Sequence, residues 1–117
     1  MNSVELKSRT KQFSLRVIRL VRALPADKVA DVIGKQLLRS GTSVGANYRS
    51  ACRAKSQADF INKIHIAEEE TDESIFWMEL LIEGKIVEDG LLHDLMKEAS
   101  ELLAIFSASA ITARKNK

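Results

Sequence analysis

Hydrophobic residues recur at spacings of three and four along almost the whole chain, and this pattern is interrupted in only three places. Such spacing places apolar side chains on one face of an α-helix. The interruptions fall at Leu24-Pro25, just before Ser56, and at Gly84. The pattern therefore predicts four helices joined by three short turns.

Local signals mark where these helices begin and end. Asn2 and Glu5 can form an amino-terminal capping box for the first helix. Pro25 ends that helix, because proline disfavours the helical conformation in the residue before it. The other helices are expected over residues 26–54, over residues 56–83 with Ser56 as cap, and from a cap at Asp89 onward. The expected inward residues of the second helix are Val29, Ile33, Leu37, Ser40, Val44, Asn47 and Ala51, and those of the third are Phe60, Ile64, Ala67, Thr71, Ile75, Met78 and Ile82.

The weak point of the second helix is the segment from Gly41 to Gly45. Two glycines with the β-branched Thr42 and Val44 cost about 2 kcal/mol of helix propensity relative to alanine. A loop is therefore an alternative here. A continuous helix is preferred, since glycines four residues apart share one face and allow a neighbouring helix to approach closely.

Four helices with short connections predict an all-α fold, an up-down-up-down antiparallel four-helix bundle forming a single domain over residues 1–117. A chain of 117 residues can bury roughly two-thirds of its unfolded surface and so supports one core. No window approaches the roughly 20 apolar residues of a membrane-spanning helix. Residues 1–12 lack the hydrophobic region of a secretory signal, so a cytoplasmic location and no membrane partner are expected.

The chain offers little catalytic chemistry. A two-metal site in a bundle requires carboxylates from several helices and Glu-x-x-His pairs, and no such pair is present. Cys52 is the only cysteine, which excludes an internal disulfide and a cysteine-based zinc site. No phosphate-binding glycine loop or nucleophile elbow occurs. These residues predict a protein that is not an enzyme and has no cofactor or catalytic metal.

Charge is divided between the two halves of the chain. Residues 1–55 hold twelve Lys or Arg against three acidic residues, a net charge of +9, whereas residues 56–117 have a net charge of −7. If each half is a helical hairpin, one side of the bundle is basic and can attract polyanions, or the acidic side of another copy. The candidate nucleic-acid-binding residues are Arg16, Arg19, Arg22, Arg39, Arg49, Arg53 and Lys55.

Some apolar residues have no place in the core of one bundle. Leu15 and Ile18 lie on the arc of the first helix opposite its core stripe, among arginines. Phe76 and Trp77 belong to a stretch of the third helix that is apolar on nearly every side, which is typical of a helix buried on both sides. These four residues are candidates for an oligomer interface. A nucleic-acid surface, a membrane contact or a solvated face remain alternatives for Leu15 and Ile18.

The second and third helices carry a recognisable combination of residues. It consists of Gln36-Leu37, Arg39-Ser40, Ser43-Val44, Asn47-Tyr48, Ala51, Phe60, Ala67, Glu70, Glu73, Trp77 and Glu79-Leu80-Leu81. With it the chain resembles the bacterial four-helix-bundle proteins called 23S rRNA-intervening sequence proteins, many of which are encoded inside insertions of the large-subunit ribosomal RNA gene. Ser50 and Glu69 depart from the family pattern, in which glutamate and lysine are common at these positions.

The resemblance implies a homopentamer arranged as a barrel around a channel. Related proteins serve diversity-generating retroelements by binding the reverse transcriptase and nucleic acid. With the basic half, this favours a non-enzymatic oligomeric scaffold that binds RNA, DNA or a nucleic-acid-handling protein partner. A purely structural oligomer without nucleic-acid binding and a membrane-surface bundle are the alternatives.

Overall fold

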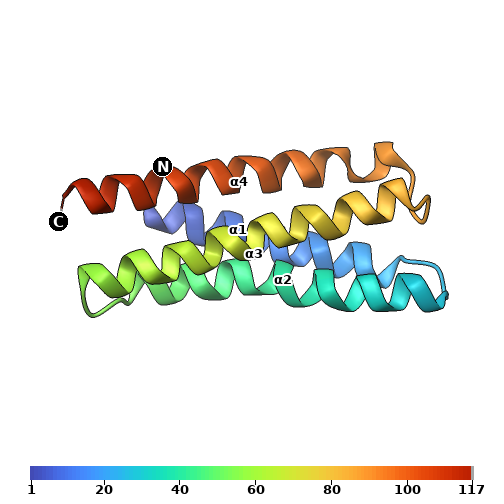
Figure 1. Ribbon diagram of the computed structural model, residues 1–117, viewed down its shortest axis with the longest axis horizontal. Helices are drawn as coiled ribbons and strands as arrows, with labels where there is room; N and C mark the ends of the chain where they lie inside the picture. The colour runs from blue at the N-terminus through green and yellow to red at the C-terminus, as the bar shows by residue number, and fades with distance from the viewer. Residues whose placement is uncertain (117) are drawn as a thin grey trace.

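The computed structural model describes residues 1–116 and contains four α-helices. They are α1 (Ser3–Arg22), α2 (Lys28–Cys52), α3 (Gln57–Glu83) and α4 (Asp89–Lys115). The helices lie side by side in a body of 47 × 21 × 20 Å, with both termini toward one end (Figure 1). The prediction of an all-α fold is confirmed.

Three of the four helix starts have the caps that local chemistry favours. Asn2 Oδ1 accepts a 2.9 Å hydrogen bond from the backbone N–H of Glu5. Asp27 accepts from Ala30 N at the start of α2, and Ser56 Oγ accepts from Asp59 N at the start of α3. Each side chain satisfies a backbone donor that the helix itself leaves without a partner. The predicted cap at Asp89 is wrong: Asp89 is the first helical residue, and Glu88 precedes it without a side-chain capping bond.

The second helix is continuous through both glycines, as predicted, although it extends over Lys28–Cys52 rather than residues 26–54. Gly34, Gly41 and Gly45 meet Leu24, Val17 and Thr10 in reverse order, so α1 and α2 run antiparallel. A Cβ atom on Gly41 would lie only 2.9 Å from two methyl carbons of Val17, whereas one on Gly45 would lie 3.4 Å from Thr10. The tightest of these contacts is therefore the one between Gly41 and the Val17 side chain.

A single core extends along the bundle. Its largest fully buried side chains are Phe13, Phe106, Leu37, Ile64, Met78, Leu81, Leu92 and Leu102. Several inward positions differ from the predicted stripes. Val29 is 55% exposed, and Ala30 and Gly34 face the core in its place. Ser74 and Leu81 of α3 are fully buried although the predicted stripe omitted them.

Polar groups join α3 to its neighbours. The hydroxyls of Ser40 and Ser74 form a buried hydrogen bond of 2.8 Å between α2 and α3. On the other side of α3, Glu68 accepts hydrogen bonds from Ser107 of α4 and, at 3.1 Å, from His65. The hydrogen bond from Ser107, more than any other cause, holds the pKa of Glu68 below its ordinary value, and the hydrogen bond from His65 and attraction to Arg114 act in the same direction.

Candidate nucleic-acid interface

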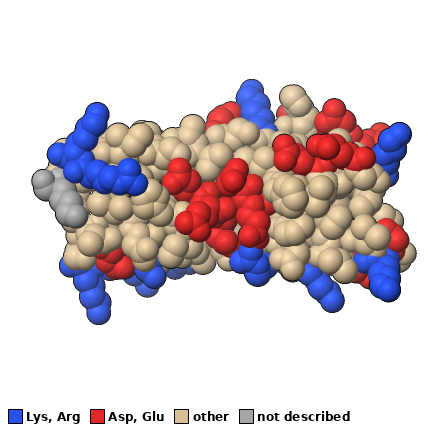
Figure 2. Space-filling view, viewed as in Figure 1, with Lys and Arg blue, Asp and Glu red and all other residues tan. Residues whose placement is uncertain are grey.

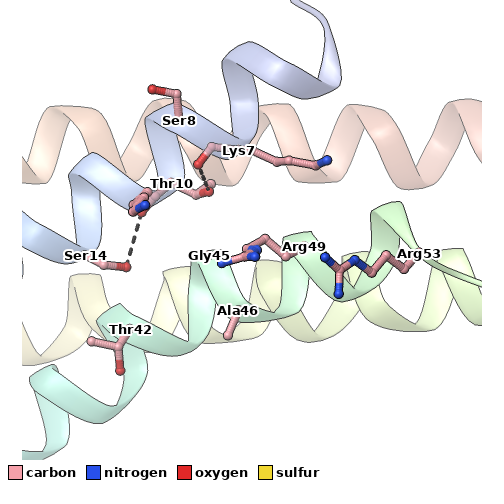
Figure 3. Close-up of a pocket in the computed structure, with 10 residues that line it drawn as sticks. Lys7, Ser8, Thr10, Ser14, Thr42, Gly45, Ala46, Arg49 and Arg53 are labelled. Carbon is pink, nitrogen blue, oxygen red and sulfur yellow. Dashed lines mark hydrogen bonds between the residues drawn. The ribbon is translucent and has the colours of Figure 1, made fainter.

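A groove runs between α1 and α2 near the amino-terminal end of α1. It has a volume of about 600 Å³, and Gly45, which has no side chain, lies along it. Lys7 and Lys11 line it from α1, and the other wall has Arg49 on α2 and Arg53 directly after α2. Figure 3 labels Lys7, Arg49 and Arg53. In both pairs the residues are four apart, so each pair occupies successive turns of one helix face. Cations therefore face the groove from both walls.

Three of the hydroxyls along this groove, those of Thr10, Ser14 and Thr42, already donate to backbone carbonyls. Thr10 Oγ1 donates to Lys7 O at 3.0 Å, a bond drawn in Figure 3. Ser14 Oγ donates to Gly41 O at 3.0 Å. Thr42 Oγ1 donates to Leu38 O at 2.7 Å. The donors that remain for an anionic ligand are thus the ammonium and guanidinium groups and the hydroxyl of Ser8.

A second hollow adjoins the first on the other side of α2. Arg49 and Arg53 line both, and Lys55 and Lys63 complete the second, which has a volume of about 740 Å³ and contains one acidic residue, Asp59. Over residues 1–116, none of the six cations of the two hollows has a carboxylate within 4.0 Å of its nitrogen atoms; they are Lys7, Lys11, Arg49, Arg53, Lys55 and Lys63. Their charges are available to a phosphate-bearing ligand.

The predicted nucleic-acid-binding residues fall into three groups. Arg49, Arg53 and Lys55 line the two hollows. Arg39 lines neither hollow. It forms ion pairs with Glu70, at 2.9 Å, and with Glu73 on α3. Attraction to Glu70, more than any other cause, raises the pKa of the Arg39 guanidinium.

The three arginines of α1 also lie outside the hollows. Arg19 and Arg22 are exposed on the face of α1 that points away from the bundle. Arg16 is half-buried and lies two turns after Arg9, so it faces the side of α1 toward α4. Arg9 itself binds Glu98 at 2.6 Å and Glu101 at 2.8 Å on α4. These cations add to the positive field of α1 without lining the groove.

Three cations of the two hollows were absent from the sequence-based candidates: Lys7, Lys11 and Lys63. A signal for two of them was present. Lys7 and Lys11 are spaced like Arg49 and Arg53, and in an antiparallel pair the start of the first helix meets the end of the second. Antiparallel pairing of the two helices therefore predicts that the two pairs of cations lie opposite each other.

Acidic residues gather on a different face. Figure 2 shows them across the middle of the molecule over α3, where Glu68, Glu69, Glu70, Asp72 and Glu73 follow one another closely. Glu73 also accepts a hydrogen bond of 3.3 Å from the indole N–H of Trp77. The charge asymmetry of the sequence is thus expressed as separate basic and acidic surfaces.

The four candidate interface residues differ in exposure. Phe76 is 50% exposed and Leu15 is 38% exposed, whereas Ile18 and Trp77 are half-buried. Trp77 packs against the core and contacts the ring of Phe76 edge-on at 5.2 Å between centroids. Ile18 lies two turns after Lys11, so the basic groove continues along α1 into an apolar stretch.

Across residues 1–116 no three or more His, Cys, Asp or Glu side chains are grouped as metal ligands. None of the four helices combines the length and the apolar character that crossing a bilayer requires.

Comparison with known families explains the combination of residues on α2 and α3. The family model of the 23S rRNA-intervening sequence proteins matches residues 2–108. The chain belongs to this family.

A solved relative has the same fold. It is a crystal structure of a protein of unknown function from the S23 ribosomal protein family of Bacteroides thetaiotaomicron, 34% identical in sequence, with a TM-score of 0.87. The similarity covers 94% of this chain and 98% of the relative. A comparison with curated proteins gives no match.

Residues that carry the resemblance to the 23S rRNA-intervening sequence proteins build the contact between α2 and α3. Arg39, Glu70, Glu73 and Trp77 form one connected network, and Ser40 bonds Ser74 beneath it. Ser50, a departure from the family pattern, lies instead in the second basic hollow. The residues that carry the resemblance therefore belong more to the contacts between helices than to the basic groove.

Proposed function

We propose that this protein is a non-enzymatic, cytoplasmic, oligomeric scaffold that binds nucleic acid through the basic groove between α1 and α2. The observation that carries this proposal is the set of four cations, Lys7, Lys11, Arg49 and Arg53, which face one groove from two helices and have no carboxylate partner within residues 1–116. Phosphate groups are the ligands that such a surface attracts most strongly.

Two further observations support a nucleic-acid ligand. The acidic group between Glu68 and Glu73 lies on α3, away from the groove, so it repels a polyanion bound there only weakly once salt screens the charges (Figure 2). The names of the family and of its solved relative refer to ribosomal RNA and to a ribosomal protein. The groove lacks a base-reading arrangement, so contacts to the phosphate backbone should dominate and sequence selectivity should be weak.

The test is fluorescence anisotropy with structured RNA and duplex DNA over a salt series. Arg49→Glu with Arg53→Glu should weaken binding by at least about tenfold, because charge reversal at two phosphate contacts removes a large share of the counterion-release term. Arg19→Glu with Arg22→Glu is the matched control, since it changes the charge equally outside the groove. Absence of binding at low salt, or equal loss in both variants, would contradict the groove as the binding site.

We also propose that up-down-up-down bundles assemble into a homopentamer, the number that the family resemblance implies. Exposed apolar side chains support assembly: Phe76 and Val32 are at least half exposed, and Leu15 and Leu38 are more than a third exposed. A closed ring would repeat the basic groove and raise avidity without new contacts. The alternative is a purely structural oligomer or a scaffold that binds a nucleic-acid-handling protein such as a reverse transcriptase.

A further inference from the structure

The carboxyl-terminal turns of α2 form a ridge between two basic hollows. Ala46, Arg49 and Arg53 line both hollows, and all three are exposed. The hollow toward α1 has Lys7 and Lys11 on its far wall, and the hollow toward α3 has Lys55 and Lys63. The arrangement is therefore two cationic hollows, called troughs from here on, with one helix between them. Figure 3 shows the trough toward α1.

The separation of the troughs follows from helix packing. Packed helices lie about 8–10 Å apart, so one trough lies on each side of α2 at roughly that spacing. An exposed helix with its side chains is about 10–12 Å wide, comparable to the major groove of B-DNA at about 12 Å. The minor groove of A-form RNA is likewise wide, and it is shallow. A low ridge flanked by cations on both sides is therefore complementary to a duplex groove bordered by two phosphate backbones.

Single-stranded nucleic acid fits the same surface less well. Proteins that bind single strands combine a positive groove with aromatic side chains on which the bases stack. The residues that line the two troughs include no Phe, Tyr or Trp. The ridge also carries the small residues Ala46 and Ser50, which leave room for the backbones to approach.

We infer that the ligand is a nucleic-acid duplex whose two strands run on either side of the α2 ridge, one backbone in each trough. This inference rests on the proposed nucleic-acid binding and adds the class of ligand. Lys7 and Lys11 contact one strand, Lys55 and Lys63 contact the other, and Arg49 and Arg53 lie between the strands and reach both.

The experiment compares three probes with the full chain: an RNA duplex of about 16 base pairs, a DNA duplex of the same length, and an oligo-uridine strand with the same number of phosphates. Two variants each change one trough. Lys7→Glu with Lys11→Glu changes the α1 side, and Lys55→Glu with Lys63→Glu changes the α3 side. Arg19→Glu with Arg22→Glu is the charge-matched control, and circular dichroism verifies that each variant is folded.

At least one of the two duplexes should bind about tenfold or more tightly than oligo-uridine. Each single-trough variant should weaken binding of that duplex. It should also make the fall of log K with log salt less steep, by about 2 in the slope, because two phosphate contacts are lost. The control should leave the slope nearly unchanged. The RNA and DNA arms identify which duplex geometry the ridge prefers.

Three outcomes would overturn the inference, and they differ in what they say about the proposed function. Equal binding of oligo-uridine and both duplexes, or loss of duplex binding in only one of the two trough variants, contradicts the straddled duplex and leaves nucleic-acid binding in place. No binding of any probe at low salt contradicts both.

Discussion

The backbone of Gly41 lies against the side chain of Val17, with no space between them for a methyl group. A Cβ atom at Gly41 would be 2.9 Å from both Cγ atoms of Val17, a separation that real structures avoid. Val17 is fully buried and its branched side chain has little freedom to turn aside. This contact sets how closely α1 and α2 approach.

Gly41→Ala should therefore destabilise the protein by about 1–3 kcal/mol through overpacking, despite the better helix propensity of alanine. Gly45→Ala is the matched control, since its Cβ would meet Thr10 at an ordinary 3.4–3.5 Å. The control should be neutral or more stable by up to about 1 kcal/mol. Urea unfolding of both variants measures the difference, and equal stability of the two would show that the contact has been misplaced.

The network around Arg39 gives a second prediction. Arg39→Met removes the cation that pairs with Glu70 and Glu73, and the side chain of Glu70 is only 16% exposed. We expect a loss of about 1 kcal/mol, because half of the arginine surface is solvated and a solvated pair contributes modestly. Arg49→Met on the same helix removes an unpaired cation and should change stability by less than about 0.5 kcal/mol. A similar effect of both changes in thermal unfolding would count against the network.

The interface candidates predict a change in assembly. Phe76→Asp should shift the protein toward the 13.0 kDa monomer in sedimentation equilibrium without loss of helix content, because Phe76 is half exposed within one chain. Leu91→Asp is the control: Leu91 is 74% exposed at the start of α4 and belongs to none of the proposed contacts. Trp77→Ala is a poorer probe, since Trp77 also packs on the core of its own chain. A wild-type protein that sediments only as a monomer would contradict the proposed assembly.

Glu68 predicts a dependence of stability on pH. Its hydrogen bonds from Ser107 and His65 lower its pKa in the folded state, so the ionised form is favoured by folding. The stabilisation is present above the ordinary glutamate pKa of about 4.5 and is lost as the pH falls through the lower folded value. Urea unfolding at a series of acidic pH values should show a shallower loss of stability for Glu68→Gln than for the wild type. Identical slopes would mean that the ionised carboxylate contributes nothing.

Much of the fold could be predicted because its signals are local. Asn2 and Ser56 cap their helices through side chains that sit beside the backbone groups they satisfy. Burial of Ser74 could not be predicted in this way. It depends on Ser40 of another helix, and a hydroxyl is tolerated in a core only where such a partner exists. Val29 was misplaced because an apolar residue can remain exposed, so hydrophobicity alone does not show which face is inward.

The basic groove was predicted in part for a similar reason. Arg49, Arg53 and Lys55 stand out by charge, and within residues 1–116 none of them forms an ion pair with a carboxylate. Arg39 has the same charge, but its availability depends on carboxylates that lie 31 and 34 residues away in sequence. Lys7 and Lys11 join the groove only because α1 and α2 pack antiparallel in one register. Composition gives the number of charges, whereas packing decides which of them a ligand can reach.

The first helix packs chiefly on α2 and touches α4 at few places, among them the ion pairs of Arg9 with Glu98 and Glu101. It is also the shortest of the four, with 20 residues against 27 in α4. Local opening of the bundle should therefore begin at α1, and its amides should exchange with solvent sooner than those of α3. Because α1 supplies one wall of the basic groove, a bound polyanion would connect this helix to α2 and slow its exchange, so occupancy could be followed as protection of residues 3–22 without labelling the ligand.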